Sequence, residues 1–190
     1  TSSLGTGRTA VEITAGNYHT CAILDDGSVS CWGYNGYGQL GDGTTTNRNT
    51  PTQTSSLGTD RTAVAITAGE YHTCAILDDG SVSCWGRNTY GRLGDGTNTD
   101  RNIPTQTSSL GTGRTAVAIT AGNYHTCAIL DDGSVSCWGW NTNGQLGDGT
   151  TTNRNTPTQT SSLGTCLLYT SDAADDSLRV DLGGRRIIKK

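Results

Sequence analysis

Short runs of apolar residues alternate with glycine-rich polar stretches along most of the chain. Residues 10–16 place a valine and an isoleucine on alternate positions, which predicts a β-strand. Residues 20–24 and 28–32 are also rich in β-type residues, and they flank an Asp-Asp-Gly turn sequence. Two such runs on either side of a short turn predict a β-hairpin.

The loop length of this hairpin decides which residues face each other. If residues 25–27 form the loop, Cys21 lies across from Cys31 and Ile23 lies across from Val29. Opposed cysteines on neighbouring strands can have Cβ atoms close enough for a disulfide bond. A two-residue loop would move the whole register by one position and separate the two cysteines.

A fourth strand is predicted after a long polar segment. Residues 33–49 are dense in Gly, Asn and Thr, which predicts an ordered loop. Residues 50–56 can be extended, and Pro51 within them restricts that strand to an edge or to its own first residues, because proline donates no ladder hydrogen bond.

This four-strand pattern occurs three times. Thr-Ser-Ser-Leu-Gly recurs every 53 residues from Thr1, and such a period indicates repeated structural units. Four antiparallel strands are the content of one propeller blade. The sequence therefore predicts an all-β fold of three four-stranded antiparallel blades within residues 1–165, at about 10–56, 63–109 and 116–162.

Composition agrees with this fold and sets the tail apart. Glycine makes up 27 of the 190 residues, and Phe and Met are absent, which fits short strands and tight turns. No apolar run is long enough for a membrane span. Residues 166–190 match no repeat; they resemble translated sequencing adapters, namely a transposase mosaic end and then a flow-cell adapter. We expect them to be a non-native, disordered tail.

The repeat also resembles a known family. The pattern Val-x-Ile-x-Ala-Gly-x-x-His-Thr-x-Ala-Ile-Leu-Asp-Asp-Gly-x-Val-x-x-Trp-Gly-x-Asn-x-x-Gly-Gln-Leu-Gly-Asp-Gly is similar to the repeat of the regulator of chromosome condensation (RCC1) family. The resemblance covers residues 1–165 and implies a seven-bladed propeller, of which three repeats would be an open arc from a longer reading frame. The cysteine pair resembles secreted bacterial members.

The six cysteines of the repeats allow three interpretations: disulfides, free thiols or zinc ligands. The pairs are Cys21–Cys31, Cys74–Cys84 and Cys127–Cys137. Zinc would need a fourth ligand beyond His19 and the two cysteines of a hairpin. We favour disulfides, which imply an oxidising, extracellular or cell-surface location.

No catalytic or cofactor chemistry is predicted. The pair Asp25-Asp26 belongs to a turn sequence, and the segment after Asp42 lacks the alternating acidic ligands of a calcium loop. Every candidate catalytic residue occurs three times in nearly the same surroundings. The repeats carry eight arginines, no lysine and thirteen carboxylates, a net charge of −5, so we expect no nucleic-acid partner.

The differences between copies indicate a binding surface. Ten of the 53 positions vary, and seven of them lie in the connections at one end of the predicted blades, while the Asp-Asp-Gly turn at the other end never varies. Variable aromatic and arginine side chains are typical of recognition surfaces, although drift in exposed loops would give a similar pattern. The predicted partner-binding residues are Tyr34, Tyr37, Glu70, Arg87, Tyr90, Arg92, Trp140 and Asn143.

Three functions fit these features. The first is a non-catalytic propeller scaffold, secreted or on the cell surface, that binds a protein partner. The second is a guanine-nucleotide exchange factor for a small GTPase, which would require reduced cysteines. The third is a tryptophan-based light sensor like the plant ultraviolet receptors that the repeats distantly resemble; it is disfavoured because Trp32, Trp85 and Trp138 lie in predicted core strands. We favour the scaffold.

Overall fold

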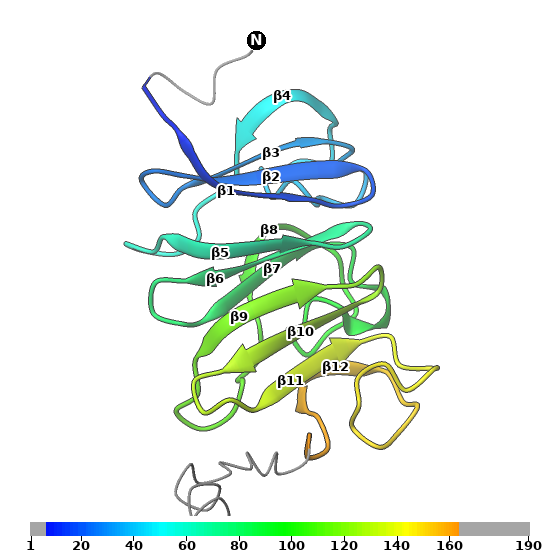
Figure 1. The fold of residues 1–190 in the computed structure, drawn as a ribbon. Coiled ribbons are helices and arrows are strands. Elements are labelled where there is room, and N and C mark those ends of the chain that lie inside the picture. Colours follow the sequence, from blue (N-terminus) through cyan, green and yellow to red (C-terminus); the bar gives the residue numbers. More distant parts are fainter. Residues whose placement is uncertain (1–6, 164–190) are drawn as a thin grey trace, which may run out of the picture.

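A computed structural model describes residues 7–163, which form three four-stranded antiparallel sheets stacked on one another, one sheet per repeat (Figure 1). The strands within each blade follow chain order. The predicted tail lies outside the described residues. The strands are β1 Ala10–Ala15, β2 His19–Leu24, β3 Val29–Gly33 and β4 Arg48–Gln53 in the first blade; β5 Ala63–Ala68, β6 His72–Leu77, β7 Val82–Gly86 and β8 Arg101–Gln106 in the second; and β9 Ala116–Ala121, β10 His125–Leu130, β11 Val135–Gly139 and β12 Arg154–Gln159 in the third.

The central hairpin has the predicted register. Cys21 is opposite Cys31 and Ile23 is opposite Val29, and the other two repeats pair identically. Gly27 has a φ of 76°, a left-handed conformation that glycine adopts without steric cost. The backbone amide of Ser28 donates to the Asp26 carboxylate at 3.1 Å, so the turn residues fix the loop that sets this register.

The fourth strand differs from its predicted limits. β4 begins at Arg48 rather than residue 50 and ends at Gln53 rather than residue 56. It begins earlier because Arg48 pairs with Gly33 across a bulge. It ends earlier because the Ser55 amide donates to the Gly41 carbonyl oxygen at 2.8 Å instead of continuing the ladder. β4 is an edge strand, as Pro51 within it requires.

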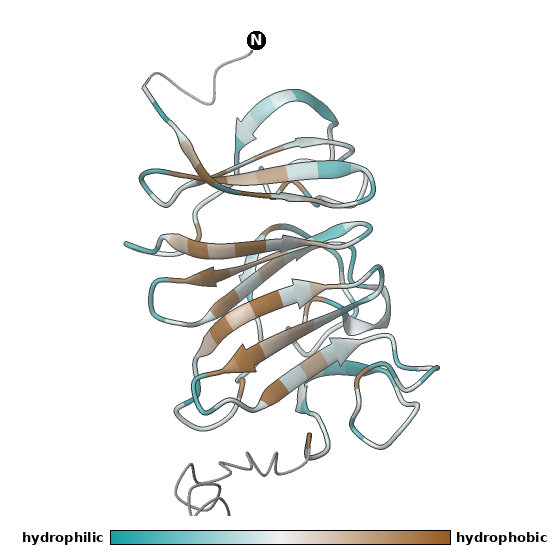
Figure 2. Cartoon of the chain, viewed as in Figure 1, coloured by the Kyte–Doolittle hydropathy of each residue, from teal (hydrophilic) through white to brown (hydrophobic). Residues whose placement is uncertain are grey.

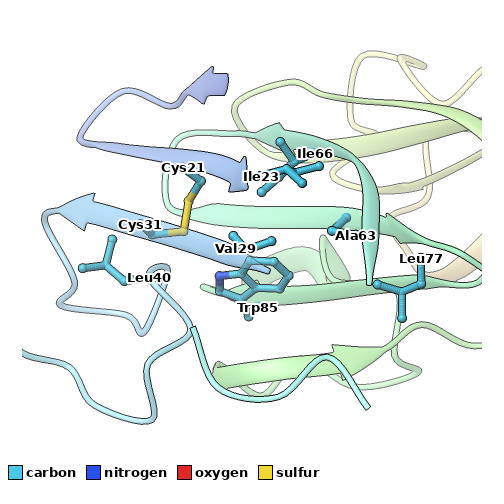
Figure 3. Packing of buried hydrophobic residues seen from close by; sticks show 10 residues of the cluster. Cys21, Ile23, Val29, Cys31, Leu40, Ala63, Ile66, Leu77 and Trp85 are labelled. Carbon is cyan, nitrogen blue, oxygen red and sulfur yellow. A yellow bond between two sulfur atoms is a disulfide. The ribbon is translucent and has the colours of Figure 1, made fainter. Parts of the chain in front are cut away.

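Each interface between blades is closed by apolar side chains from both blades. Between the first and second blades, Ile23, Val29 and Leu40 pack with Ile66 and Trp85, all of them buried (Figure 3). The corresponding residues fill the interface between the second and third blades. Figure 2 shows that apolar residues concentrate on the strands and polar residues at the connections. The core is therefore a series of layers between the sheets.

One tryptophan departs from the predicted core. Trp85 and Trp138 are 0% exposed, but Trp32 is only half-buried. Trp85 packs toward the preceding blade, against Leu40, and Trp138 does so against Leu93. Within residues 7–163 no blade precedes the first one. Tryptophans at equivalent positions of identical sequence stretches thus differ in burial because their blades occupy different positions in the stack.

Candidate functional site

The long connection between β3 and β4 is organised around the fully buried side chain of Asn35. Its Nδ2 donates to the carbonyl oxygens of Thr44 and Thr46, each at 3.1 Å. Its Oδ1 accepts from the Leu40 amide at 2.9 Å. Asn88 and Asn141 organise the equivalent loops in much the same way. These bonds make the glycine-rich segment an ordered loop, as predicted, and they fix the positions of the aromatic residues that it carries.

Asp42 is a structural member of the same loop. Its carboxylate accepts from the Thr44 hydroxyl at 2.7 Å and from Arg48 Nε at 2.8 Å. Burial acts to raise the pKa of Asp42, but these hydrogen bonds and the Arg48 charge outweigh it and hold the pKa below its usual value. With its lone pairs occupied by protein donors, Asp42 holds the loop closed.

An aromatic cluster joins the first and second blades at the end that carries these loops. The rings of Tyr18 and Tyr71 are stacked, with centroids 5.1 Å apart and planes 4° apart. Tyr34 and Tyr37 each approach Tyr71 edge-on, at 5.9 Å and 5.1 Å. The Arg87 guanidinium lies 4.7 Å from the Tyr37 ring centroid, within cation–π range. Five side chains from two blades thus form one surface.

A second cluster joins the second and third blades. Tyr90 lies 6.4 Å from Trp140 and 6.5 Å from Tyr124. The Tyr124 ring contacts Trp140 edge-on at 5.6 Å. A hydrogen bond and the charge of Glu70 raise the pKa of Tyr124, so Glu70 supports this cluster from the second blade. We call the two clusters together the loop face.

Arg92, one of the predicted contact residues, lies beneath the loop face and not on its surface. Its side chain is 1% exposed. The guanidinium donates to the Thr89 and Asn123 carbonyl oxygens at 3.0 Å and 3.2 Å, and it lies 5.0 Å from the Tyr124 ring centroid. Burial, and then the charge of Arg87, lower the pKa of Arg92 to about 10. The extra length of arginine over the glutamine of the other repeats lets it cross to the third blade and support the loop face from beneath.

The other predicted contact residues all lie at this end of the blades. Tyr34 and Tyr90 are exposed, Tyr37, Arg87 and Trp140 are half-buried, and Asn143 is exposed with no ring to add to the cluster. Their role as partner contacts stays a prediction.

Sequence reasoning misses three tyrosines of the loop face: Tyr18, Tyr71 and Tyr124. They do not vary between copies, and variation is the only signal that selects the predicted contact residues. A second signal was present in the sequence. Each tyrosine directly follows a variable position in the connection between the first two strands of its blade, at the same end as the long loops.

The charged side chains at the opposite end of the blades form ion pairs with one another. In each repeat an arginine lies within ion-pair distance of both aspartates of the Asp-Asp-Gly turn. The closest contacts to the second aspartate are Arg8–Asp26 at 2.7 Å, Arg61–Asp79 at 3.1 Å and Arg114–Asp132 at 3.2 Å. These exposed pairs contribute little stability, but they leave this end with few unpaired charges.

All three cysteine pairs are disulfides, with S–S distances of 2.12–2.16 Å. The sulfurs are therefore not available as zinc ligands, and residues 7–163 contain no cluster of three metal-binding side chains. His19 instead bridges two blades, with its Nε2 2.8 Å from Thr73 Oγ1. Thr73 donates its own proton to the Gln39 carbonyl oxygen at 2.9 Å, so the histidine nitrogen is the donor to the threonine.

Comparison with known proteins accounts for the repeated architecture. A family model described as the regulator of chromosome condensation (RCC1) repeat matches residues 26–76, 79–129 and 132–170, and a second model of the same description matches residues 10–39, 63–92 and 116–145. The chain belongs to the RCC1 repeat family. The resemblance drawn from the sequence is confirmed.

Relatives in this family include the ultraviolet-B receptor UVR8 of Arabidopsis thaliana, which is 34% identical over 147 residues. The match covers 77% of this chain and 33% of the receptor. The human E3 ubiquitin-protein ligase HERC2 is 36% identical over 137 residues, covering 72% of this chain but only 3% of the ligase. The chain thus spans a third or less of these two relatives.

Solved structures show the same fold. Prp20p from Saccharomyces cerevisiae superposes with a TM-score of 0.73 at 22% identity, covering 82% of this chain and 39% of Prp20p. Human WBSCR16 superposes with a TM-score of 0.51 at 20% identity, covering 82% of this chain and 54% of that protein. The predicted RCC1-like β-propeller architecture is confirmed. Within residues 7–163 no helix is long and apolar enough to cross a membrane.

Proposed function

We propose that this RCC1-repeat chain is a non-catalytic scaffold that binds a protein partner through its loop face. The observation that carries the proposal is the arrangement of Arg87 among tyrosines from two blades. Six other arginines of residues 7–163 pair with aspartates, whereas Arg87 and the buried Arg92 have no carboxylate within ion-pair distance. Arginine and aromatic side chains dominate the energetics of protein interfaces.

The surroundings of Arg87 indicate which part of a partner it would contact. The guanidinium uses its Nε for the Thr89 hydroxyl at 3.1 Å, and its remaining N–H groups can bind an acceptor pair on a partner. Its planar fork fits a carboxylate or two backbone carbonyl oxygens. The stacked tyrosines beside it supply a rigid apolar area that loses little conformational entropy on binding.

Secretion or display at the cell surface is the second part of the proposal. It is supported by the three disulfides, since such bonds persist in oxidising compartments and are rare in the cytosol. The same bonds weigh against the alternative of a guanine-nucleotide exchange factor. That alternative draws on the likeness to Prp20p, a protein studied for its binding to Gsp1p and histones, and at 22% identity the likeness supports the fold alone.

Light sensing gains no support from the geometry of the tryptophans. UVR8 is an ultraviolet-B receptor by name. Here Trp85 and Trp138 are buried in two separate interblade cores, and Trp140 belongs to the loop face. A protein-binding role therefore accounts for more of the described aromatic residues than light sensing does.

Peptide selection tests the scaffold proposal and can begin from random sequences. Binders would be selected from a random peptide display library on the whole chain and then measured against single variants. We expect Arg87→Ala and Trp140→Ala each to weaken binding by about 1 kcal/mol or more. Asp79→Asn in the opposite turn is the matched control and should leave affinity unchanged. Binders that depend on Asp26, Asp79 or Asp132 but not on the loop face would overturn the proposal.

A further inference from the structure

A hollow of about 490 Å³ lies between the long loop of the second blade and the fourth strand of the third blade. Its lining residues are Thr89, Tyr90, Asn98, Asn153 and Asn155. The first three belong to the loop between β7 and β8, and the two others lie at the start of β12. Its volume is in the range of small-molecule binding sites. We call it the interblade hollow.

The repeats differ at the positions that line this hollow. Where the first and second blades meet, the equivalent residues are Gly36, Tyr37, Thr45, Asp100 and Asn102. A hydroxyl group and an amide are therefore missing there, and a carboxylate replaces a second amide. The surroundings of the tyrosine differ as well, because the Arg87 guanidinium lies 4.7 Å from the Tyr37 ring centroid. The neutral polar lining is thus a property of the junction between the second and third blades.

Tyr90 lines the hollow in an unusual backbone conformation. Its φ is 70°, a left-handed value that tyrosine rarely adopts. The next residue, Gly91, lies against the third blade so closely that a Cβ there would overlap the Cα of Asn155. This contact fixes the loop on β12 and leaves the Tyr90 side chain 42% exposed. Strained conformations that the surrounding structure holds in place often occur at binding sites.

The three asparagines offer both donors and acceptors to the hollow. Asn153 Oδ1 accepts from the Asn141 backbone amide at 2.8 Å, so its Nδ2 group stays available as a donor. Asn155 Nδ2 donates to the Gly96 carbonyl oxygen at 2.9 Å, so its Oδ1 stays available as an acceptor. Asn98 is exposed, and its side chain has no hydrogen-bond partner within the described chain.

This combination of groups defines the class of ligand. None of the five lining side chains carries a charge, so a charged ligand would lose hydration without gaining a counter-charge from the lining. A ligand that satisfies both donors and acceptors must offer both on neighbouring atoms, as the hydroxyl groups of a sugar do. The C–H face of a pyranose ring is apolar and packs against an aromatic ring such as that of Tyr90.

We propose that the interblade hollow binds a neutral saccharide. The sugar ring packs on Tyr90, and its hydroxyl groups bond to the amides of Asn98, Asn153 and Asn155. This activity goes beyond the protein-binding role proposed above. The hollow shares only Tyr90 with the loop face and does not include the Arg87 cluster that carries the scaffold proposal.

A glycan array with neutral and anionic oligosaccharides tests this proposal on the whole chain. We expect binding to neutral glycans, and isothermal titration with the strongest array ligand then compares single variants. Three variants give a lining position the residue that another repeat carries there: Tyr90→Asn, Asn98→Thr and Asn153→Asp. The same fold already accommodates each of these residues. Asp100, for example, accepts the Asn88 amide at 2.7 Å, in the way that Asn153 accepts the Asn141 amide.

Tyr90→Asn should weaken binding at least about tenfold, because it removes the aromatic platform. Asn98→Thr and Asn153→Asp should each weaken binding about fivefold or more, because each removes an amide that bonds to the sugar. Circular dichroism checks that each variant stays folded. Thr151→Asn, the reverse exchange at the equivalent position of the third repeat, is the matched control and should leave affinity unchanged.

Asn98→Thr should also leave the affinity of the selected peptides unchanged, so that the saccharide and scaffold proposals can fail separately. The saccharide proposal is refuted if the array shows no glycan binding or binding to anionic glycans alone. It is equally refuted if all three variants bind the array ligand as tightly as the unaltered chain, because the ligand would then occupy another surface.

Discussion

The energy of the interface between blades can be measured by comparing two variants, Trp85→Ala and Trp32→Ala. The two tryptophans occupy equivalent positions in identical stretches of sequence. Trp85 is 0% exposed and packs with Val29 and Leu40 of the first blade, whereas Trp32 is half-buried. Because local sequence and strand position are the same, the difference between the two variants reports the contribution of the neighbouring blade.

The magnitude follows from the packing around the indole. A Cβ at Gly41 would lie 2.8 Å from Trp85 Nε1, so the first blade is in close contact with this ring. Removing a fully buried tryptophan destabilises a protein by about 3–5 kcal/mol, because the apolar transfer energy is lost and a cavity remains. Trp32 already has part of its surface in water, so we expect its replacement to cost about half as much.

Urea unfolding followed by circular dichroism in the far ultraviolet is suited to this comparison, because it does not depend on tryptophan fluorescence. Equal losses in the two variants would show that the tryptophan is stabilised within its own blade and that the preceding blade adds nothing. A change of slope as well as midpoint would show that the blades unfold separately.

Two further predictions concern the buried histidines and the disulfides. Burial lowers the pKa of His19 from 6.5 to about 4 and holds that of His72 further below its usual value. The stability that comes from neutral His19 is therefore complete above pH 6.5 and is lost toward pH 4, a loss on the order of 2 kcal/mol. Urea midpoints at about pH 7.5 and about pH 4.5 measure this loss. An unchanged midpoint would contradict the prediction. Reduction of a Cys166→Ser chain should add six hydrogens to its intact mass. It should lower the free energy of unfolding by about 2–3 kcal/mol per disulfide. Full alkylation of the six cysteines in the native chain would contradict this prediction.

Much of each blade is determined by short-range sequence. The Asp-Asp-Gly turn limits the hairpin to one loop length, because Gly27 supplies the positive φ and Asp26 accepts the Ser28 amide. Register then follows from the turn, and with it the pairing of Cys21 with Cys31. The edge position of β4 follows from Pro51, which lacks a donor. These features depend on residues close together in the chain, so the sequence could predict them.

The loop face could be predicted only in part. Variation between copies indicates the end of the blades at which the aromatic clusters lie, but it omits Tyr71 and includes the buried Arg92. Stacking of Tyr71 on Tyr18 depends on the distance between neighbouring blades, and the burial of Arg92 depends on its reach to Asn123 of the third blade. Both are relations between residues far apart in the chain, which no local pattern contains.

Burial was decided by the stack of blades alone. The sequence around Ile23, Ile76 and Ile129 is the same, and so are their strands and their hairpin partners. Local physics therefore assigns all three the same conformation. Their exposure differs because apolar surface is removed from water only where another blade lies against it, and the presence of that blade is a property of the tertiary structure.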